Sequence, residues 1–158
     1  MDQKLARVIE RQLVTLGENG RMELTKQYCQ HGTCSVYVHC LHVAYDSCLL
    51  CRRLGIRVRW RELIRGALLH DYFLYDWHDK ASRHRLHGFY HPGVALRNAR
   101  EDFRLTRTEE DIILHHMFPL TVIPPHTREG WIVSCADKIC TVLEVLRKEC
   151  VVHEAYDT

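Results

Sequence analysis

Apolar residues recur along the chain at the three- and four-residue spacing of amphipathic helices. Residues 2–16 show this spacing first, and Gly17 and Gly20 are expected to end that helix. Its apolar positions are Leu5, Val8, Ile9, Leu13 and Leu16. No segment shows the alternation of apolar and polar residues that is typical of a half-buried strand. The pattern therefore predicts helices joined by short breaks.

Capping residues, glycines and prolines indicate where the later helices begin and end. Thr33 or Ser35 is expected to cap a helix that reaches about Arg53 and stops at 54–55. Further helices are expected over about 60–75, from Pro92 in a first turn, from a cap at Thr108 to a point before Pro119, and over about 127–148. We predict an all-α fold, with residues 1–158 forming a single-domain helical bundle of five to seven helices.

Four polar residues fall on the inward, apolar faces of these predicted helices: His39, the neighbours His70 and Asp71, and Asp137. Burying an unpaired carboxylate costs several kcal/mol, so two inward aspartates require a nearby cation or donors. Two neutral imidazoles and two carboxylates form a suitable ligand set for a divalent transition-metal ion, whose charge offsets the buried acids. The pattern predicts that all four side chains converge on one metal.

The composition is that of a globular protein with an excess of histidine. Hydrophobic residues make up 46% and charged residues 27% of the 158 positions, and 12 positions hold histidine, the commonest metal ligand. The formal net charge of +2 gives no argument for binding to nucleic acid or to a membrane surface, and we expect neither partner.

The cysteines bear on the expected compartment. The N-terminal sequence lacks the apolar core of a signal peptide, and no apolar stretch approaches membrane-spanning length. We therefore expect a cytoplasmic protein whose eight cysteines are free and buried. Cys48 and Cys51 form a CxxC pair without a second such pair, and we interpret them as structural residues.

The ordered set of His39, the doublet His70-Asp71, and Asp137 resembles the H…HD…D signature of the HD-domain superfamily of metal-dependent phosphohydrolases. The resemblance covers roughly residues 31–147, the expected metal-binding core. It implies an all-α fold with the metal at the centre of the bundle. It also implies hydrolysis of a phosphate ester or anhydride, most often in a nucleotide.

A subset of that superfamily has further histidines that bind a second metal. Candidates are His87 and His91 in "HGFYHPGVAL", and His115 and His116 in "DIILHHMFPL". We favour His116 because it falls on the apolar face of its helix, and His91 because it matches the family's "HP". The full pattern resembles the dinuclear branch, which implies two divalent ions (Fe, Mn, Co, Ni or Zn) bridged by Asp71.

The implied function is hydrolysis of a nucleotide or small phosphate ester by a metal-activated water, with Asp71 and His70 as the catalytic pair. The substrate contacts are expected from four basic residues, Lys138, Arg128, Lys80 and Arg83, with Arg85 in the same loop as the last two. The chain lacks the GYP motif of cyclic-dinucleotide phosphodiesterases, which makes that subclass a poor match. A di-iron oxygenase on the same fold and a non-catalytic nucleotide-sensing domain stay open as alternatives.

Overall fold

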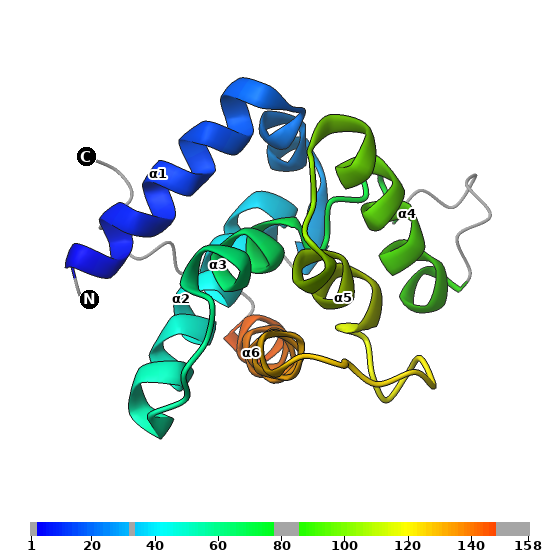
Figure 1. Ribbon diagram of the computed structural model, residues 1–158. Coiled ribbons are helices and arrows are strands. Elements are labelled where there is room, and N and C mark those ends of the chain that lie inside the picture. The colour runs from blue at the N-terminus through cyan, green and yellow to red at the C-terminus, as the bar shows by residue number, and fades with distance from the viewer. Residues whose placement is uncertain (1–2, 32–33, 78–85, 148–158) are drawn as a thin grey trace.

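The computed structural model describes residues 3–31, 34–77 and 86–147 (Figure 1). These residues form six α-helices, one 3-10 helix and two short strands. The α-helices are α1 (Gln3–Asn19), α2 (Val36–Leu54), α3 (Trp60–Leu69), α4 (His87–Asp102), α5 (Arg107–His115) and α6 (Arg128–Arg147). The predicted all-α fold is confirmed.

The segment between α1 and α2 contains elements that the sequence pattern did not predict. The 3-10 helix η1 (Met22–Gln27) is followed by β1 (Cys29–His31) and β2 (Cys34–Ser35), which pair antiparallel. Strands of two and three residues are too short to show alternation, which is why they were missed. Of the two glycines predicted to end the first helix, Gly17 lies inside α1, because an interior glycine only weakens a helix, whereas Gly20 directly follows its last residue, Asn19.

The caps of α2 follow the predicted chemistry. The hydroxyl oxygen of Ser35 accepts a hydrogen bond from the backbone N–H of Val38 at 3.3 Å. At the other end Gly55 has a φ of 64°, a left-handed conformation that glycine adopts without steric cost. The N–H of Ile56 then donates to the carbonyl of Cys51 at 2.9 Å. Of the two candidate caps, Ser35 is the one that begins the helix.

Thr106, rather than the predicted Thr108, caps α5. Its hydroxyl accepts from the N–H of Glu109 at 3.2 Å, and the Glu109 carboxylate accepts from the N–H of Thr106 at 2.8 Å. This reciprocal capping box requires a glutamate three residues after the threonine, and only Thr106 has Glu109 at that spacing.

The helices around the His70-Asp71 pair also have different boundaries from those predicted. α3 ends at Leu69 rather than near residue 75, so Asp71 lies in a turn, where its carbonyl accepts from the N–H of Phe73 at 2.8 Å. The residues of this turn are buried as well, so their sequence continues the apolar pattern of the helix and the helix was predicted too long. α4 begins at His87, so Pro92 lies inside the helix rather than in its first turn.

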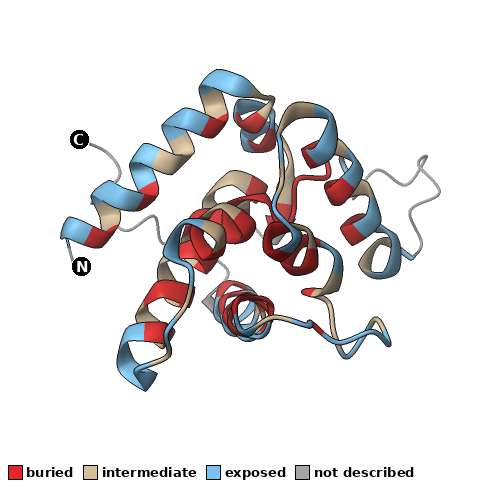
Figure 2. Ribbon diagram, viewed as in Figure 1, coloured by how far each residue is buried: buried red, intermediate tan, exposed pale blue. Residues whose placement is uncertain are grey.

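The centre of the molecule lies where α2, α3, α5 and α6 pack together. α2 packs against α3 and α6, and α5 packs against both α3 and α6. A Cβ atom added to Gly66 on α3 would lie 2.4 Å from Cδ1 of Ile112 on α5, so this close approach needs glycine. Buried residues gather on these central helices, whereas α1 is exposed along most of its length (Figure 2).

Asp111 of α5 accepts hydrogen bonds from the residues just before α6. Its carboxylate accepts hydrogen bonds from the backbone N–H of His126 at 3.0 Å, and from the N–H and hydroxyl of Thr127 at 2.9 and 2.6 Å. Burial raises the pKa of Asp111, but these donors outweigh it and lower the pKa to about 2. These hydrogen bonds hold the start of α6 against α5.

Among the described residues, three cysteines depart from the prediction that all are free and buried thiols, because Cys29 is half-buried, Cys135 is exposed and Cys34 is not a free thiol. Cys34 is disulfide-bonded. Such a pairing cannot be deduced from cysteine spacing. A disulfide is more common in oxidising compartments, so Cys34 gives the predicted cytosolic location no support. Six others are free, four of them buried: Cys29, Cys40, Cys48, Cys51, Cys135 and Cys140.

The CxxC pair lies on α2. Burial raises the pKa of Cys48 to about 12 and that of Cys51 to about 11, which disfavours the reactive thiolate and fits a structural role. Within the described ranges, no helix is both long enough and apolar enough to cross a lipid bilayer.

Candidate metal centre

Six side chains converge at the centre of the molecule. His39 comes from α2, His70 and Asp71 from the end of α3 and the turn after it, His91 from α4, His116 from the end of α5, and Asp137 from α6. Each is buried, with at most 6% of its surface exposed. These are the six residues predicted as metal ligands, brought together from positions up to 98 residues apart.

All four histidines are held through the same ring nitrogen. A carbonyl or carboxylate oxygen only accepts hydrogen bonds, so Nδ1 carries the proton and Nε2 is the atom left to coordinate a metal. The Nδ1 atoms donate to the carbonyls of Ala67 (His70, 2.7 Å), His87 (His91, 3.0 Å) and Ile113 (His116, 2.8 Å), and to the carboxylate of Glu144 (His39, 2.9 Å).

The first group of Nε2 and oxygen atoms suits one metal ion. His39 Nε2 is 3.1 Å from Asp137 Oδ1, and His70 Nε2 is 3.7 Å from the same oxygen and 3.4 Å from Asp71 Oδ2. Adjacent ligands bonded to one ion at roughly 2.0–2.1 Å lie about 3.0–3.4 Å apart. His70 Nε2 is buried without a hydrogen-bond partner, which a metal at this position would supply.

The second group includes Asp71 Oδ1, which is 3.0 Å from His91 Nε2 and 3.4 Å from His116 Nε2. The two Nε2 atoms are 2.9 Å apart. Because both rings donate through Nδ1, two neutral rings would turn lone pairs toward each other here. A cation between them relieves that repulsion, so the atoms present fit a second metal.

Asp71 lies between the two groups, with Oδ2 toward His39 and His70 and Oδ1 toward His91 and His116. This is the geometry that a carboxylate bridging two ions requires. The turn that follows α3 gives Asp71 this position, while His70 caps the C-terminal end of α3 just after the last helical residue, Leu69.

Burial and charge act in opposite directions on the ionisable groups of the centre. Burial raises the pKa of Asp71, but electrostatic interactions with His70 and His91 and hydrogen bonds with His116 and His91 hold it well below its usual range. Asp137 is likewise buried, yet His39 and His70 lower its pKa. Both aspartates are therefore carboxylates at neutral pH, as metal ligands must be.

Gln30 on β1 contacts the centre and was not predicted from the sequence. Its side-chain nitrogen donates to Asp71 Oδ2 at 2.5 Å, which fixes the orientation of that carboxylate. A carboxylate only accepts, so the Gln30 carbonyl oxygen must face away from Asp71, and it has no hydrogen-bond partner among the described residues. A glutamine in a three-residue strand gives no sequence signal for this role.

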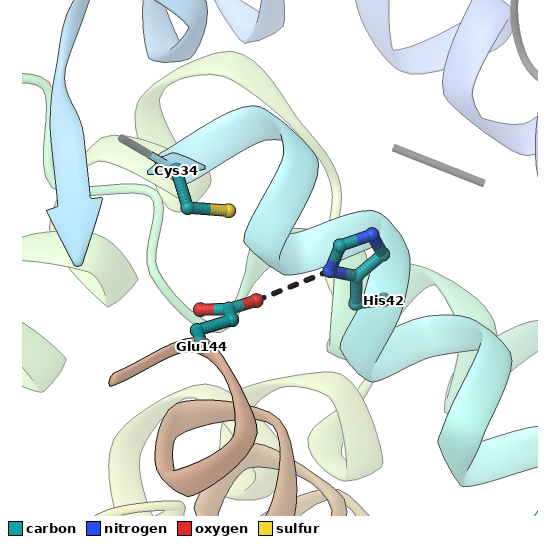
Figure 3. A group of neighbouring side chains, drawn as sticks. All are labelled: Cys34, His42 and Glu144. Carbon is teal, nitrogen blue, oxygen red and sulfur yellow. Dashed lines mark hydrogen bonds and ion pairs between the residues drawn. The ribbon is translucent and has the colours of Figure 1, made fainter. Parts of the chain in front are cut away.

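Glu144 on α6 is a second contact that the sequence analysis missed. Its carboxylate accepts from His39 Nδ1 at 2.9 Å and from His42 Nδ1 at 3.1 Å. Figure 3 shows Glu144 with His42 and the nearby Cys34. Because the sulfur of Cys34 is in a disulfide, we do not count these three residues as a further metal site. Glu144 instead orients His39.

The alternative histidines lie beside the centre. His87 accepts or donates a 2.9 Å hydrogen bond with the Tyr75 hydroxyl, and its ring stacks on His91 with centroids 4.6 Å apart. His115 Nδ1 lies 2.9 Å from Asp111, on the other side of α5. The structure thus brings His91 and His116, rather than these neighbours, to the other candidate ligands.

The predicted substrate-binding residues lie in different parts of the chain relative to the candidate metal centre. Lys138 borders the centre, but its ammonium donates to the His116 carbonyl at 2.9 Å and to the Ser134 carbonyl and hydroxyl. Arg128 lines a different cavity with Trp131, one that contains none of the candidate ligands, so its position gives a substrate contact no support. Lys80, Arg83 and Arg85 lie outside the described residues.

The fold and the site define a helical protein with a buried centre of histidines and aspartates, side chains of the kinds that ligate divalent metal ions. The family model of the HD domain matches residues 36–141, about two thirds of the chain. The chain belongs to the HD domain family, whose members are mostly metal-dependent phosphohydrolases. Neither a search of curated proteins nor a search of solved structures found a match.

Proposed function

We propose that this protein is a phosphohydrolase that uses two divalent metal ions to cleave a nucleotide or another small phosphate ester. The observation that carries the proposal is the position of Asp71 between two pairs of histidine Nε2 atoms. When bound, two ions would activate a water for attack on phosphorus and neutralise charge on the phosphoryl oxygens.

The chain's own groups have distinct parts in this proposal. His39, His70 and Asp137 would hold one ion, His91 and His116 the other, with Asp71 shared. Gln30 holds the Asp71 carboxylate in the shared orientation. Asp71 and Asp137, both ionised, would hold the ions and orient the attacking water. The packed helices and the hydrogen bonds to the histidine rings keep these groups fixed, which reduces the reorganisation needed during the reaction.

The test is a panel of nucleotides and phosphate monoesters assayed with manganese, iron, cobalt and nickel. We expect release of inorganic phosphate that stops when the metal is chelated and returns when it is restored. Asp71→Asn should abolish the activity, since a neutral amide cannot bridge two cations. The matched control is Asp76→Asn, which changes an exposed residue five positions along the chain and should leave activity intact.

The same panel separates the two alternatives. Oxygen consumption by the iron-loaded protein without phosphate release would indicate an oxygenase. Binding of a nucleotide without turnover under every metal would indicate a sensing domain. Either result contradicts the proposed hydrolysis.

A further inference from the structure

A cavity of about 810 Å³ opens beside the candidate metal centre. Part of its lining is polar and comes from the ligand set: Asp71, His91 and Asp137. Much of the remaining lining is apolar and forms what we call the apolar wall. It comes from Trp77, from the start of α4, from the segment after α5 and from α6. Its residues are Trp77, Leu86, Phe89, Met117, Leu120 and Val142.

The apolar wall exposes several large hydrophobic side chains to the same cavity. Leu86, Phe89, Leu120 and Val142 are each between 45% and 56% exposed, although all four line the same hollow. Single exposed apolar residues are ordinary on a protein surface, but several that line one cavity beside a reactive centre are typical of a ligand site.

Outside the candidate ligands, most polar groups of the described lining already make hydrogen bonds within the protein. Lys138 donates to the carbonyls of His116 and Ser134. Thr141 donates to Asp137 at 3.4 Å, and Gln30 donates to Asp71. The Gln30 carbonyl oxygen is left as an acceptor. A sugar with several hydroxyl groups would find few partners among these residues, and unpaired polar groups are costly to bury.

We propose that the apolar wall binds the organic part of the substrate, and that the substrate is a phosphate monoester of a predominantly apolar, aryl or alkyl, alcohol. The inference rests on the proposed function, because the phosphate is assigned to the metal centre at the polar end of the cavity. A volume of about 810 Å³ leaves room for an organic group well beyond the phosphate and is within the usual range of small-molecule sites.

The direct test is binding, which does not depend on turnover. Methylphosphonate and benzylphosphonate have the same anionic group and differ in one aromatic ring. Calorimetric titration of the manganese-reconstituted protein should give about ten- to a hundredfold tighter binding of benzylphosphonate, the gain expected when one ring leaves water. Equal affinities, or no binding of either phosphonate, would overturn the proposal.

A matched pair of variants locates the effect. Val142 lines the cavity and Val145 does not, yet both are on α6 and both are 56% exposed. Val142→Asn should reduce the preference for benzylphosphonate by about threefold or more, whereas Val145→Asn should leave it unchanged. Phe89→Ser and Tyr90→Ser form a second such pair at the start of α4, where Phe89 lines the cavity. Equal effects within either pair contradict the assignment.

Kinetics distinguish failure of this inference from failure of the proposed function. If phenyl phosphate and glucose 6-phosphate are hydrolysed with the same kcat/KM, the protein is a phosphohydrolase and the apolar subsite is wrong. If no ester is hydrolysed but benzylphosphonate binds more tightly in a Val142-dependent way, the subsite stands and hydrolysis does not.

Discussion

Replacing Glu144 with glutamine should weaken one metal site and spare the other. Glu144 is 7% exposed and its carboxylate contacts both His39 Nδ1 and His42 Nδ1. Burial raises the pKa of Glu144, but hydrogen bonds with these two imidazoles lower it to about 2, so the group is ionised throughout the neutral range. The variant Glu144→Gln keeps the size of the side chain and removes its charge.

The magnitude follows from the position of Glu144 behind a ligand. A carboxylate that accepts from the outer nitrogen of a metal-bound histidine fixes the ring and raises the basicity of its inner nitrogen, and loss of such a partner costs about 10- to 100-fold in metal affinity. That corresponds to about 1.4–2.7 kcal/mol. The loss should fall on the site that contains His39, because Glu144 contacts no ligand of the other site among the described residues.

The assay is competition with a chelating dye, which gives a dissociation constant for each metal equivalent. Glu144→Gln should raise one of the two dissociation constants, and the unchanged constant of the other metal ion serves as an internal control. Glu110→Gln is the matched substitution, since Glu110 pairs with Arg100 at 2.7 Å on the surface of α5 and should affect neither constant. Equal weakening of both equivalents, or of none, would refute the role given to Glu144.

Three further predictions concern metal content and stability. Chelation should lower the melting temperature by about 5–10 °C, because a ligand at 100 times its Kd adds about 2.7 kcal/mol of stability to a domain of this size; an unchanged melting curve for protein shown to contain metal would count against it. His91→Ala and His116→Ala should each remove one metal equivalent in elemental analysis, and a stoichiometry unchanged by both would rule out the second site. Asp111 has a folded pKa of about 2, below its unfolded value, so its stabilisation of about 2 kcal/mol is present above pH 4 and is lost as the pH falls toward 2. Denaturant titrations should show that Asp111→Asn removes this contribution to the free energy of unfolding at pH 7. Between pH 4 and pH 2 the free energy of unfolding of the variant should fall less steeply than that of the wild type, and an equally steep fall would contradict the prediction.

The candidate ligands within helices could be located from the sequence because helical periodicity decides which side chains face inward. His39 and Asp137 lie in the middle of α2 and α6, where that periodicity is regular. Asp71 was placed correctly at the centre although α3 ends two residues before it, because the turn that follows is buried as well.

The residues that hydrogen-bond to the candidate ligands were harder to predict. Glu144 follows Asp137 by seven residues, two helical turns, so its inward position was available from periodicity, but its partners His39 and His42 are on another helix. Gln30 depends on the pairing of two very short strands, for which single-sequence patterns give no signal. Tertiary contacts of this kind are set by how elements pack, and only the structure shows them.

Anomalous diffraction from crystals of the manganese-reconstituted protein tests the proposed bridging of two metal ions by Asp71. We expect two peaks about 3.5–4 Å apart, one on each side of the Asp71 carboxylate. One peak should lie beside His39, His70 and Asp137, and the other beside His91 and His116. A single peak at full reconstitution, or a pair of peaks that Asp71 does not join, would contradict the claim.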